Sequence, residues 1–202
     1  MNIVCLDMEG VLVPEIWIAF AEKTGISEFR RTTRDEPDFD KLMHYRIELM
    51  RQHQLTLNRV IEVIDKIEPF DGAREFISRL REVCQVVIIS DTFDIFGRPL
   101  MRQLGWPTLF HNEVEIDNDG YMVGYKLRTS HTKRDTVKGL QACGGVDTIA
   151  AGDGYNDLEM IRASKAGFLF RAPEKIKAAN PDVRALEEYD ELYNAIMEVI
   201  EK

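Results

Sequence analysis

Short, continuously apolar segments alternate along the chain with segments of helical periodicity. Residues 3–8, 86–90, 148–151 and 167–170 are short and rich in Val and Ile. Strands that are apolar at every position are typical of a parallel sheet buried on both faces. Amphipathic stretches at 72–83, 94–104, 133–142 and 156–163 lie between or after them. The alternation predicts an α/β fold, with a Rossmann-like parallel sheet core and right-handed crossovers.

Residues 15–69 interrupt this alternation, because they contain three helical stretches and no strand signal. "EIWIAFAEKTG" ends at Gly25, and "FDKLMHYRIELMRQH" spaces its apolar residues three and four positions apart. "TLNRVIEVIDKI" begins at Thr56, a residue that favours the N-cap position. A block of this length predicts an inserted helical cap at 15–69. The α/β catalytic core would then consist of residues 1–14 and 70–202.

A second interruption, "EVEIDNDGYMVGYKL" at 113–127, predicts a small β-hairpin. Two runs of alternating apolar and polar residues flank the turn sequence "NDG". The free edge of such a hairpin is a candidate surface for pairing in a homodimer. The last residues, "LEEYDELYNAIMEVIEK", predict an amphipathic helix that packs on the core.

Polar residues gather where the predicted strands end. In an open α/β sheet, ligands bind beyond the carboxyl ends of the strands, so these residues are expected to converge. Most of them follow one of the first three predicted strands, and Lys133 begins the helix before the third strand. The full set is Asp7, Glu9, Ser90, Asp91, Lys133, Asp153, Asn156 and Asp157. A lysine at a helix start opposes the helix dipole, which favours a functional role for Lys133. Thr132 before it is a candidate N-cap.

This set of residues has the chemistry of a phosphoryl-transfer site. Crowded carboxylates resist ionisation unless a divalent cation neutralises them, and hard oxygen ligands suit Mg²⁺. A carboxylate can attack phosphorus and form an acyl-phosphate. A lysine, a serine hydroxyl and backbone N–H groups can hold the phosphoryl oxygens. A second acid can protonate the leaving oxygen and later accept a proton from the acceptor.

"DMEGVL", "IIS", Lys133 and "GDGYND", in this order, resemble the four motifs of the haloacid dehalogenase-like phosphohydrolases. The resemblance implies that Asp7 is the nucleophile and Glu9 the general acid/base. It implies Mg²⁺ binding by Asp7, the main-chain carbonyl of Glu9 and Asp153, with Asp157 supporting the metal shell. By the same resemblance, Ser90 and Lys133 hold the phosphate, and Asn156 lies near the phosphate or the acceptor.

The helical insert directly after the first motif resembles the cap of the phosphoserine phosphatases. In that family, a Glu shortly after the first motif and an Arg on a cap helix bind the ammonium and carboxylate of the amino acid. Glu15 and Arg46 match those positions. The match is physically reasonable, because a guanidinium can clamp a carboxylate through two parallel hydrogen bonds. Without the resemblance, an arginine on a helix more often belongs to a solvated face.

Two departures from the family pattern resemble a narrower branch, the bifunctional phosphoserine phosphatase/homoserine phosphotransferases. The second acid of the first motif is usually Asp and is Glu9 here; the residues after the motif serine are usually glycines and are Asp91 and Thr92 here. Homoserine is serine with one more methylene, so the same clamp could hold donor and acceptor in turn. Asp91 is expected either beside the substrate or in a turn or cap. The longer side chain of Glu9, together with Asp91, is a candidate cause of a preference for an alcohol acceptor.

The expected activity is therefore Mg²⁺-dependent hydrolysis of phosphoserine through an aspartyl-phosphate on Asp7, with transfer to homoserine as a second outcome. The resemblance implies a role in serine and threonine biosynthesis. One alternative is a phosphatase or phosphotransferase for another small phosphomonoester, such as a sugar phosphate. Another is a receiver-type signalling module, although receivers carry their acidic pair on the first strand, accept phosphate on a later one and have no helical cap.

Composition narrows the possible partners. The chain has 202 residues, a net charge of -9 and 45% hydrophobic residues, which is ordinary for a globular protein and offers no basic patch for nucleic acid. No apolar run approaches the length of a membrane span. The three cysteines are far apart and there is no basic leader with an apolar segment, so a cytoplasmic protein with reduced thiols is expected.

Overall fold

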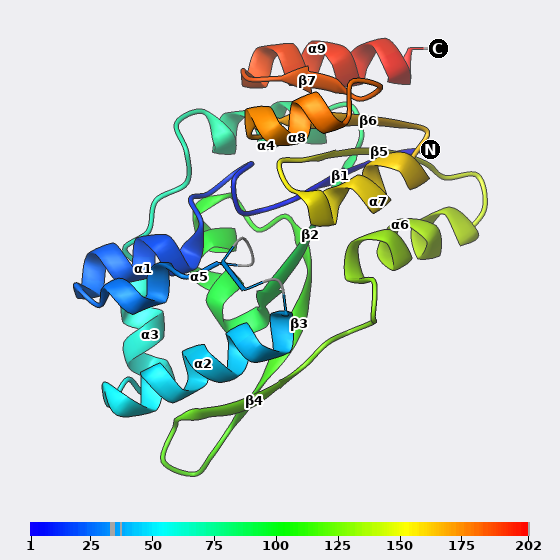
Figure 1. Cartoon of the computed structure of the whole chain (residues 1–202). Helices are drawn as coiled ribbons and strands as arrows, with labels where there is room; N and C mark the ends of the chain where they lie inside the picture. Colours follow the sequence, from blue (N-terminus) through cyan, green and yellow to red (C-terminus); the bar gives the residue numbers. More distant parts are fainter. Residues whose placement is uncertain (33–34, 37, 202) are drawn as a thin grey trace.

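Seven strands form one sheet in the computed structural model, which describes residues 1–32, 35–36 and 38–201. The strands are β1 (Asn2–Leu6), β2 (Gln85–Phe93), β3 (Thr108–Ile116), β4 (Met122–Lys126), β5 (Asp147–Gly152), β6 (Ala166–Phe170) and β7 (Arg184–Leu186). Their order is β4-β3-β2-β1-β5-β6-β7, and every pair is parallel except β3 with β4. The predicted α/β fold is confirmed, and β1 lies at the middle of the sheet (Figure 1).

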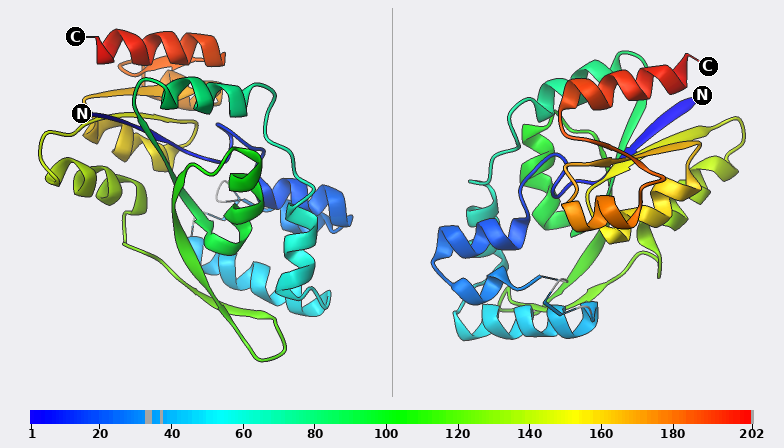
Figure 2. Two further views of the ribbon diagram at one scale, coloured as in Figure 1. Left: turned by 180° about the vertical axis from the view of Figure 1, so that it is seen from behind. Right: turned by 45° about the horizontal axis from the view of Figure 1, so that its top comes forward.

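Six of the helices in the described residues cover the two faces of the sheet, and the other three lie beside it. The helices are α1 (Ile16–Thr24), α2 (Phe39–Gln52), α3 (Leu57–Ile64), α4 (Ala73–Arg81), α5 (Asp94–Gln103), α6 (Thr132–Ala142), α7 (Leu158–Ala163), α8 (Glu174–Ala179) and α9 (Tyr189–Ile200), with short 3₁₀ turns η1 (Ser27–Arg30) and η2 (Tyr155–Asp157). The apolar side chains of α4, α5 and α9 belong to one core cluster, and those of α6, α7 and α8 to another. Figure 2 shows the two layers from further directions.

The two cores explain why the strands are continuously apolar. In β1, Val4 and Leu6 belong to the first cluster, whereas Ile3 and Cys5 belong to the second. Successive side chains of a strand point to opposite faces, so a strand covered by helices on both sides needs apolar residues at every position. The strand is thereby a fixed base for whatever follows its carboxyl end.

Strand β2 differs from its prediction in a way that matters for the site. It was expected to end at Ser90, but it continues to Phe93. Between the pairs Ile89↔Phe110 and Phe93↔Asn112, β2 advances four residues while β3 advances two. The extra residues form a β-bulge, a device that redirects side chains near active sites. Ser90 and Asp91 therefore lie in an irregular segment inside the strand.

Several short elements were not predicted. The first half of β3, the three-residue strand β7 and helix α8 carry too few residues to show a clear periodicity. Thr132 was expected to cap α6, but it is the first residue of that helix and His131 occupies the N-cap position. Thr56 and Gly25 do occupy the predicted positions at the start of α3 and the end of α1.

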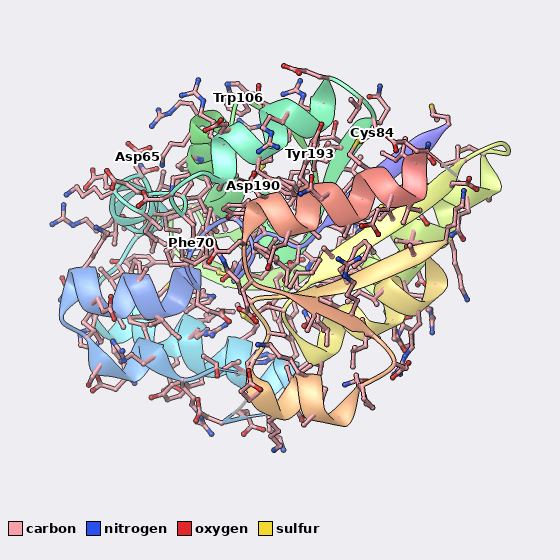
Figure 3. All side chains as sticks on the ribbon, turned by 90° about the horizontal axis from the view of Figure 1, so that it is seen from above. Asp65, Phe70, Cys84, Trp106, Asp190 and Tyr193 are labelled. Atoms are coloured by element: carbon pink, nitrogen blue, oxygen red, sulfur yellow. The ribbon has the colours of Figure 1, made fainter. Side chains whose placement is uncertain are left out.

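Helices α1, α2 and α3 lie together beside one end of the sheet, where the helical cap was predicted (Figure 1). The two connections to this segment meet at its base, because the Phe70 N–H donates to the Leu12 carbonyl over 2.9 Å. The Tyr189 hydroxyl, from α9, donates to the neighbouring Val11 carbonyl over 2.7 Å. Figure 3 shows Phe70 beside the start of α9. The division into a core of 1–14 and 70–202 and a cap of 15–69 remains a prediction.

The predicted hairpin is present as the antiparallel pair β3–β4, and it contacts the helical segment. Its turn accepts a hydrogen bond at the Gly120 carbonyl from the Leu57 N–H over 2.8 Å. Arg51 of α2 forms an ion pair of 2.8 Å with Asp117. The hairpin thus supports the cap helices from below in the view of Figure 1. Pairing of its free edge in a homodimer remains a prediction. Within the described residues, no helix is long and apolar enough to cross a membrane.

Replacing Tyr189 by Phe is expected to lower the free energy of unfolding by about 1–3 kcal/mol, because the buried Val11 carbonyl loses its donor. Urea unfolding followed by circular dichroism measures this change. Tyr193→Phe on the same helix is the matched control: its hydroxyl makes no hydrogen bond to the described residues, so the change should stay within about 0.5 kcal/mol. Equal effects of the two variants would contradict the role of the Tyr189 hydroxyl.

Candidate active site

A tight loop follows β1 and carries the first group of candidate residues. The Met8 carbonyl accepts hydrogen bonds from the Leu12 N–H over 2.9 Å and the Val13 N–H over 3.0 Å. Gly10 has a φ of +77°, and a Cβ at this position would lie 2.4 Å from an Asp153 carboxylate oxygen. Only glycine allows this conformation and this close approach. The loop, residues 8–13, is called the flap below.

Three carboxylates, one directly after β1 and two from the segment after β5, meet at this edge of the sheet. Ligand oxygens of Asp7, Asp153 and Asp157 lie within 4.8 Å of one another. Lys133, near the start of α6, donates from Nζ to Asp7 Oδ1 over 2.8 Å and to Asp157 Oδ1 over 2.6 Å. Asp157 is fully buried, and its other oxygen accepts from the Gly154 N–H over 2.8 Å. The parallel sheet therefore brings the predicted residues of β1, β5 and α6 together.

The electrostatics of this group call for a further positive charge. Burial raises the pKa of Asp7 well above its ordinary value, Asp157 and Asp153 raise it further, and Lys133 acts in the opposite direction. Burial alone would lower the pKa of Lys133, but Asp157 and Asp7 outweigh it and raise that pKa well above the usual range. One ammonium faces three carboxylates, all with hard oxygen ligands. The donor set therefore fits a divalent cation such as Mg²⁺.

The bulge in β2 places Ser90 and Asp91 at the same edge. Ser90 is buried, and its Oγ accepts from the Thr92 N–H over 3.2 Å. One carboxylate oxygen of Asp91 accepts from the Thr132 hydroxyl, and the other accepts from Asn156 Nδ2 over 3.0 Å. Burial alone would raise the pKa of Asp91, but Lys133 and these two hydrogen bonds outweigh it, so the pKa lies below its ordinary value. Asp91 is thus an anion held by two of the segments that carry site residues.

The side chain of Glu9 links the flap to the helical segment. Its Oε2 accepts from the Ile16 N–H, at the start of α1, over 2.8 Å. Burial raises the pKa of Glu9 to about 8, and Glu15 raises it as well; the Ile16 hydrogen bond and Arg46 lower it. With a pKa of about 8, Glu9 is mostly protonated at pH 7, the state that a general acid needs.

Arg46 presents a buried positive charge to the same space. Its guanidinium stacks over Trp17 at 4.5 Å and donates to the Arg31 carbonyl over 2.9 Å. Among the described residues, no carboxylate lies within 4.0 Å of it, and its Nε has no hydrogen-bond partner. Burial lowers the pKa of Arg46 to about 10, although Glu9 and Glu15 oppose this, so it stays charged at neutral pH. A buried charge without a carboxylate partner is suited to binding an anion.

These groups surround one cavity of about 970 Å³. Nine of the ten predicted site residues line it: Asp7, Glu9, Glu15, Arg46, Ser90, Asp91, Lys133, Asp153 and Asn156. The tenth, Asp157, does not line it and lies behind Lys133. Sequence reasoning missed the apolar part of the wall, which includes Trp17, Phe39, Met43 and Phe93. In the sequence these residues show only helical or strand periodicity, and that pattern is the same for a core residue and for a residue that lines a cavity.

Comparisons with known proteins identify the family of the chain. A family profile for haloacid dehalogenase-like hydrolases matches residues 1–165. The protein belongs to this family. The predicted family is thereby confirmed, and it excludes the receiver-type signalling module considered as an alternative.

Two relatives from Pseudomonas are similar along nearly the whole chain. The protein named phosphoserine phosphatase ThrH of Pseudomonas aeruginosa is 50% identical over 95% of this chain and 93% of its own. A phosphoserine phosphatase of Pseudomonas syringae is 48% identical over 95% of this chain and 81% of its own. These relatives place the chain in the predicted phosphoserine phosphatase branch of the haloacid dehalogenase-like hydrolases.

Solved structures share the fold of this haloacid dehalogenase-like hydrolase. A substrate-bound phosphoserine phosphatase complex superposes with a TM-score of 0.75 at 21% identity, covering 93% of both chains. An apo form of phosphoserine phosphatase gives a TM-score of 0.72 at 23% identity, covering 93% of this chain and 94% of the other. At this identity the likeness establishes the fold alone.

Adding Mg²⁺ is expected to raise the melting temperature, because the ion would bind the assembled carboxylates and not the unfolded chain. At 100 times the dissociation constant, the gain is about 2.7 kcal/mol, or about 5–10 °C for a chain of this length. Differential scanning fluorimetry with Mg²⁺ and then EDTA measures it. Asp153→Asn should reduce the rise, whereas Asp147→Asn, an exposed partner of Lys165 at the start of β5, should not. An equal rise in both variants would contradict the assignment.

Proposed function

We propose that the protein is a Mg²⁺-dependent phosphoserine phosphatase that forms an aspartyl-phosphate on Asp7 and can also transfer the phosphoryl group to homoserine. The observation that carries this proposal is the position of Arg46. A buried guanidinium without a carboxylate partner lines the same cavity as the Asp7–Lys133 pair. The cavity thus offers one site for a phosphate and another for a carboxylate, as a phosphorylated amino acid requires.

In the first step, Asp7 attacks the phosphorus atom of phosphoserine. Asp7 Oδ1 already accepts from the Met8 N–H over 2.7 Å and from Lys133 over 2.8 Å, which leaves Oδ2 as the attacking oxygen. The bond between phosphorus and the seryl oxygen breaks, and the electron pair stays on that oxygen. Glu9 donates its proton to the same oxygen, so serine leaves as a neutral alcohol.

In the second step, Glu9 accepts a proton from the acceptor while the acceptor oxygen attacks phosphorus. The bond from phosphorus to Asp7 breaks, and the carboxylate of Asp7 is restored. Water as acceptor gives inorganic phosphate, and the hydroxyl of homoserine gives phosphohomoserine. The choice between the two depends on which acceptor occupies the cavity, and a cap that excludes water favours transfer.

The remaining residues hold the reacting groups. Ser90, Lys133 and Asn156 bind the phosphoryl oxygens, while Asp91 holds Asn156 through its amide. Asp7, Asp153 and the Glu9 carbonyl would hold Mg²⁺, with Asp157 behind them. When bound, the ion neutralises charge on the phosphoryl group and on the carboxylates.

The helical segment supplies the contacts for the amino-acid part of the substrate. Arg46 binds the carboxylate, and Glu15, which lines the same cavity, accepts from the ammonium. A sugar phosphate has neither group, so these residues favour phosphoserine over that alternative. Homoserine carries the same two groups, and the apolar wall of Trp17, Phe39 and Met43 can accommodate its additional methylene.

The deciding experiment is incubation with phosphoserine and Mg²⁺, with and without homoserine, followed by assays of free phosphate and phosphohomoserine. We expect free phosphate in both reactions and phosphohomoserine when homoserine is present. Asp7→Asn should abolish both products while circular dichroism shows an intact fold, because an amide cannot form the acyl-phosphate. Full activity of Asp7→Asn would refute the nucleophile, and the absence of phosphohomoserine would refute the transfer activity alone.

Replacing Arg46 by Ala is expected to raise KM for phosphoserine about 10- to 100-fold, because hydrogen bonds to a charged group contribute about 1.5–3 kcal/mol. Steady-state kinetics measure the change. Lys41→Ala is the matched control, since Lys41 lies on the same helix but is exposed and paired with the nearby Asp38. An unchanged KM in Arg46→Ala would contradict phosphoserine as the substrate.

A further inference from the structure

Helix α1 has an unusual start. Its N-cap residue is Glu15, yet the Glu15 side chain makes no capping hydrogen bond. The first N–H groups of a helix lack partners within the helix and are usually satisfied by a side chain at the N-cap. Here the Ile16 N–H donates instead to Glu9 Oε2 over 2.8 Å. The helix is therefore capped by a residue seven positions earlier, on the flap.

The flap that carries Glu9 is firmly attached to the core. The Val11 carbonyl accepts from Tyr189 over 2.7 Å, and the Leu12 carbonyl accepts from the Phe70 N–H over 2.9 Å. Gly10 packs directly against the Asp153 side chain. With the flap backbone held in this way, the Glu9 side chain is a bridge from the catalytic sheet edge to the first turn of the cap.

Side-chain length decides whether this bridge exists. Aspartate at the same position would be shorter by one carbon–carbon bond, about 1.5 Å. Starting from a 2.8 Å contact, that loss would leave donor and acceptor beyond hydrogen-bonding distance unless the flap or the helix moved. Glu9, where the family usually has aspartate, therefore makes a hydrogen bond to Ile16 that the shorter acid could not make.

The contact controls the placement of the neighbouring residue. Ile16 directly follows Glu15, whose side chain lines the cavity together with Arg46. We propose that Glu9 is a positioning residue in addition to its acid/base role. Its carboxyl group fixes the first turn of α1 and thereby places Glu15 for the ammonium of the substrate. The roles of Glu15 and of the Glu9 proton rest on the proposed function, whereas the bridge to Ile16 does not.

Two variants separate the two roles of Glu9. Glu9→Gln keeps the length of the side chain and an oxygen that can accept from Ile16, but it cannot transfer a proton. Glu9→Asp keeps a carboxylic acid but loses the bridge. We expect amide hydrogen exchange at Ile16 to accelerate about ten-fold or more in Glu9→Asp and to stay near the wild-type rate in Glu9→Gln. Glu22→Asp, an exposed residue on the same helix, is the control for shortening an acid and should leave this exchange unchanged.

Kinetics provide a second readout. Glu9→Gln should lose kcat and keep its KM for phosphoserine. Glu9→Asp should retain turnover but show a raised KM for phosphoserine and an unchanged KM for p-nitrophenyl phosphate, which has no ammonium for Glu15 to bind. Wild-type exchange at Ile16 in Glu9→Asp would overturn the bridge. Equal changes of KM for both substrates would overturn the placement of Glu15. If the wild-type protein did not turn over phosphoserine, the proposed function would fail, and the exchange rates would still decide the bridge.

Discussion

The ammonium of Lys133, buried between Asp7 and Asp157, is the interaction on which the site depends. It joins the end of the central strand to the segment after β5, and it comes from α6, which packs against β2, β5 and α7. Removing either partner would leave an uncompensated charge in a buried place, which is strongly unfavourable. The same arrangement brings the carboxylates of Asp7, Asp153 and Asp157 close together, and their excess of negative charge suits the cluster to a divalent cation. In the proposed function, the arrangement that is costly for stability is the one that the chemistry uses.

In the proposed function, the recognition of a substrate is divided between two parts of the molecule. The sheet edge supplies the groups that suit a phosphoryl group, and the helical segment supplies Arg46, which suits a carboxylate. The two parts have to be held in register for one ligand to contact both. Three connections do this: the flap bonded to Phe70 and Tyr189, the hairpin contacts to α2 and α3, and the hydrogen bond from Ile16 to Glu9.

Two departures from the common family pattern have visible structural consequences. Glu9 is long enough to cap the first cap helix, and Asp91 accepts hydrogen bonds from Thr132 and Asn156. A glycine at position 91 could make neither of these two bonds. Both substitutions therefore add connections between segments that carry site residues. Under the proposed function, these connections would hold the wall of the cavity in place, and a wall held in this way would help to exclude water in favour of an alcohol acceptor.

The sequence by itself determined the α/β class and the family, and it predicted the helical cap and ten site residues, nine of which line one cavity. Each of these is expressed in local periodicity or in a short motif. The continuous apolar run of β1 and the order of the four motifs needed no knowledge of the fold. Tertiary structure decided the extension of β2 to Phe93, the bulge that turns Ser90 and Asp91, and the short strand β7. It also decided that Thr132 binds Asp91 instead of capping α6, and that Glu9 binds Ile16. These features depend on which side chain meets which backbone group across the fold, and no local pattern in the chain encodes that meeting.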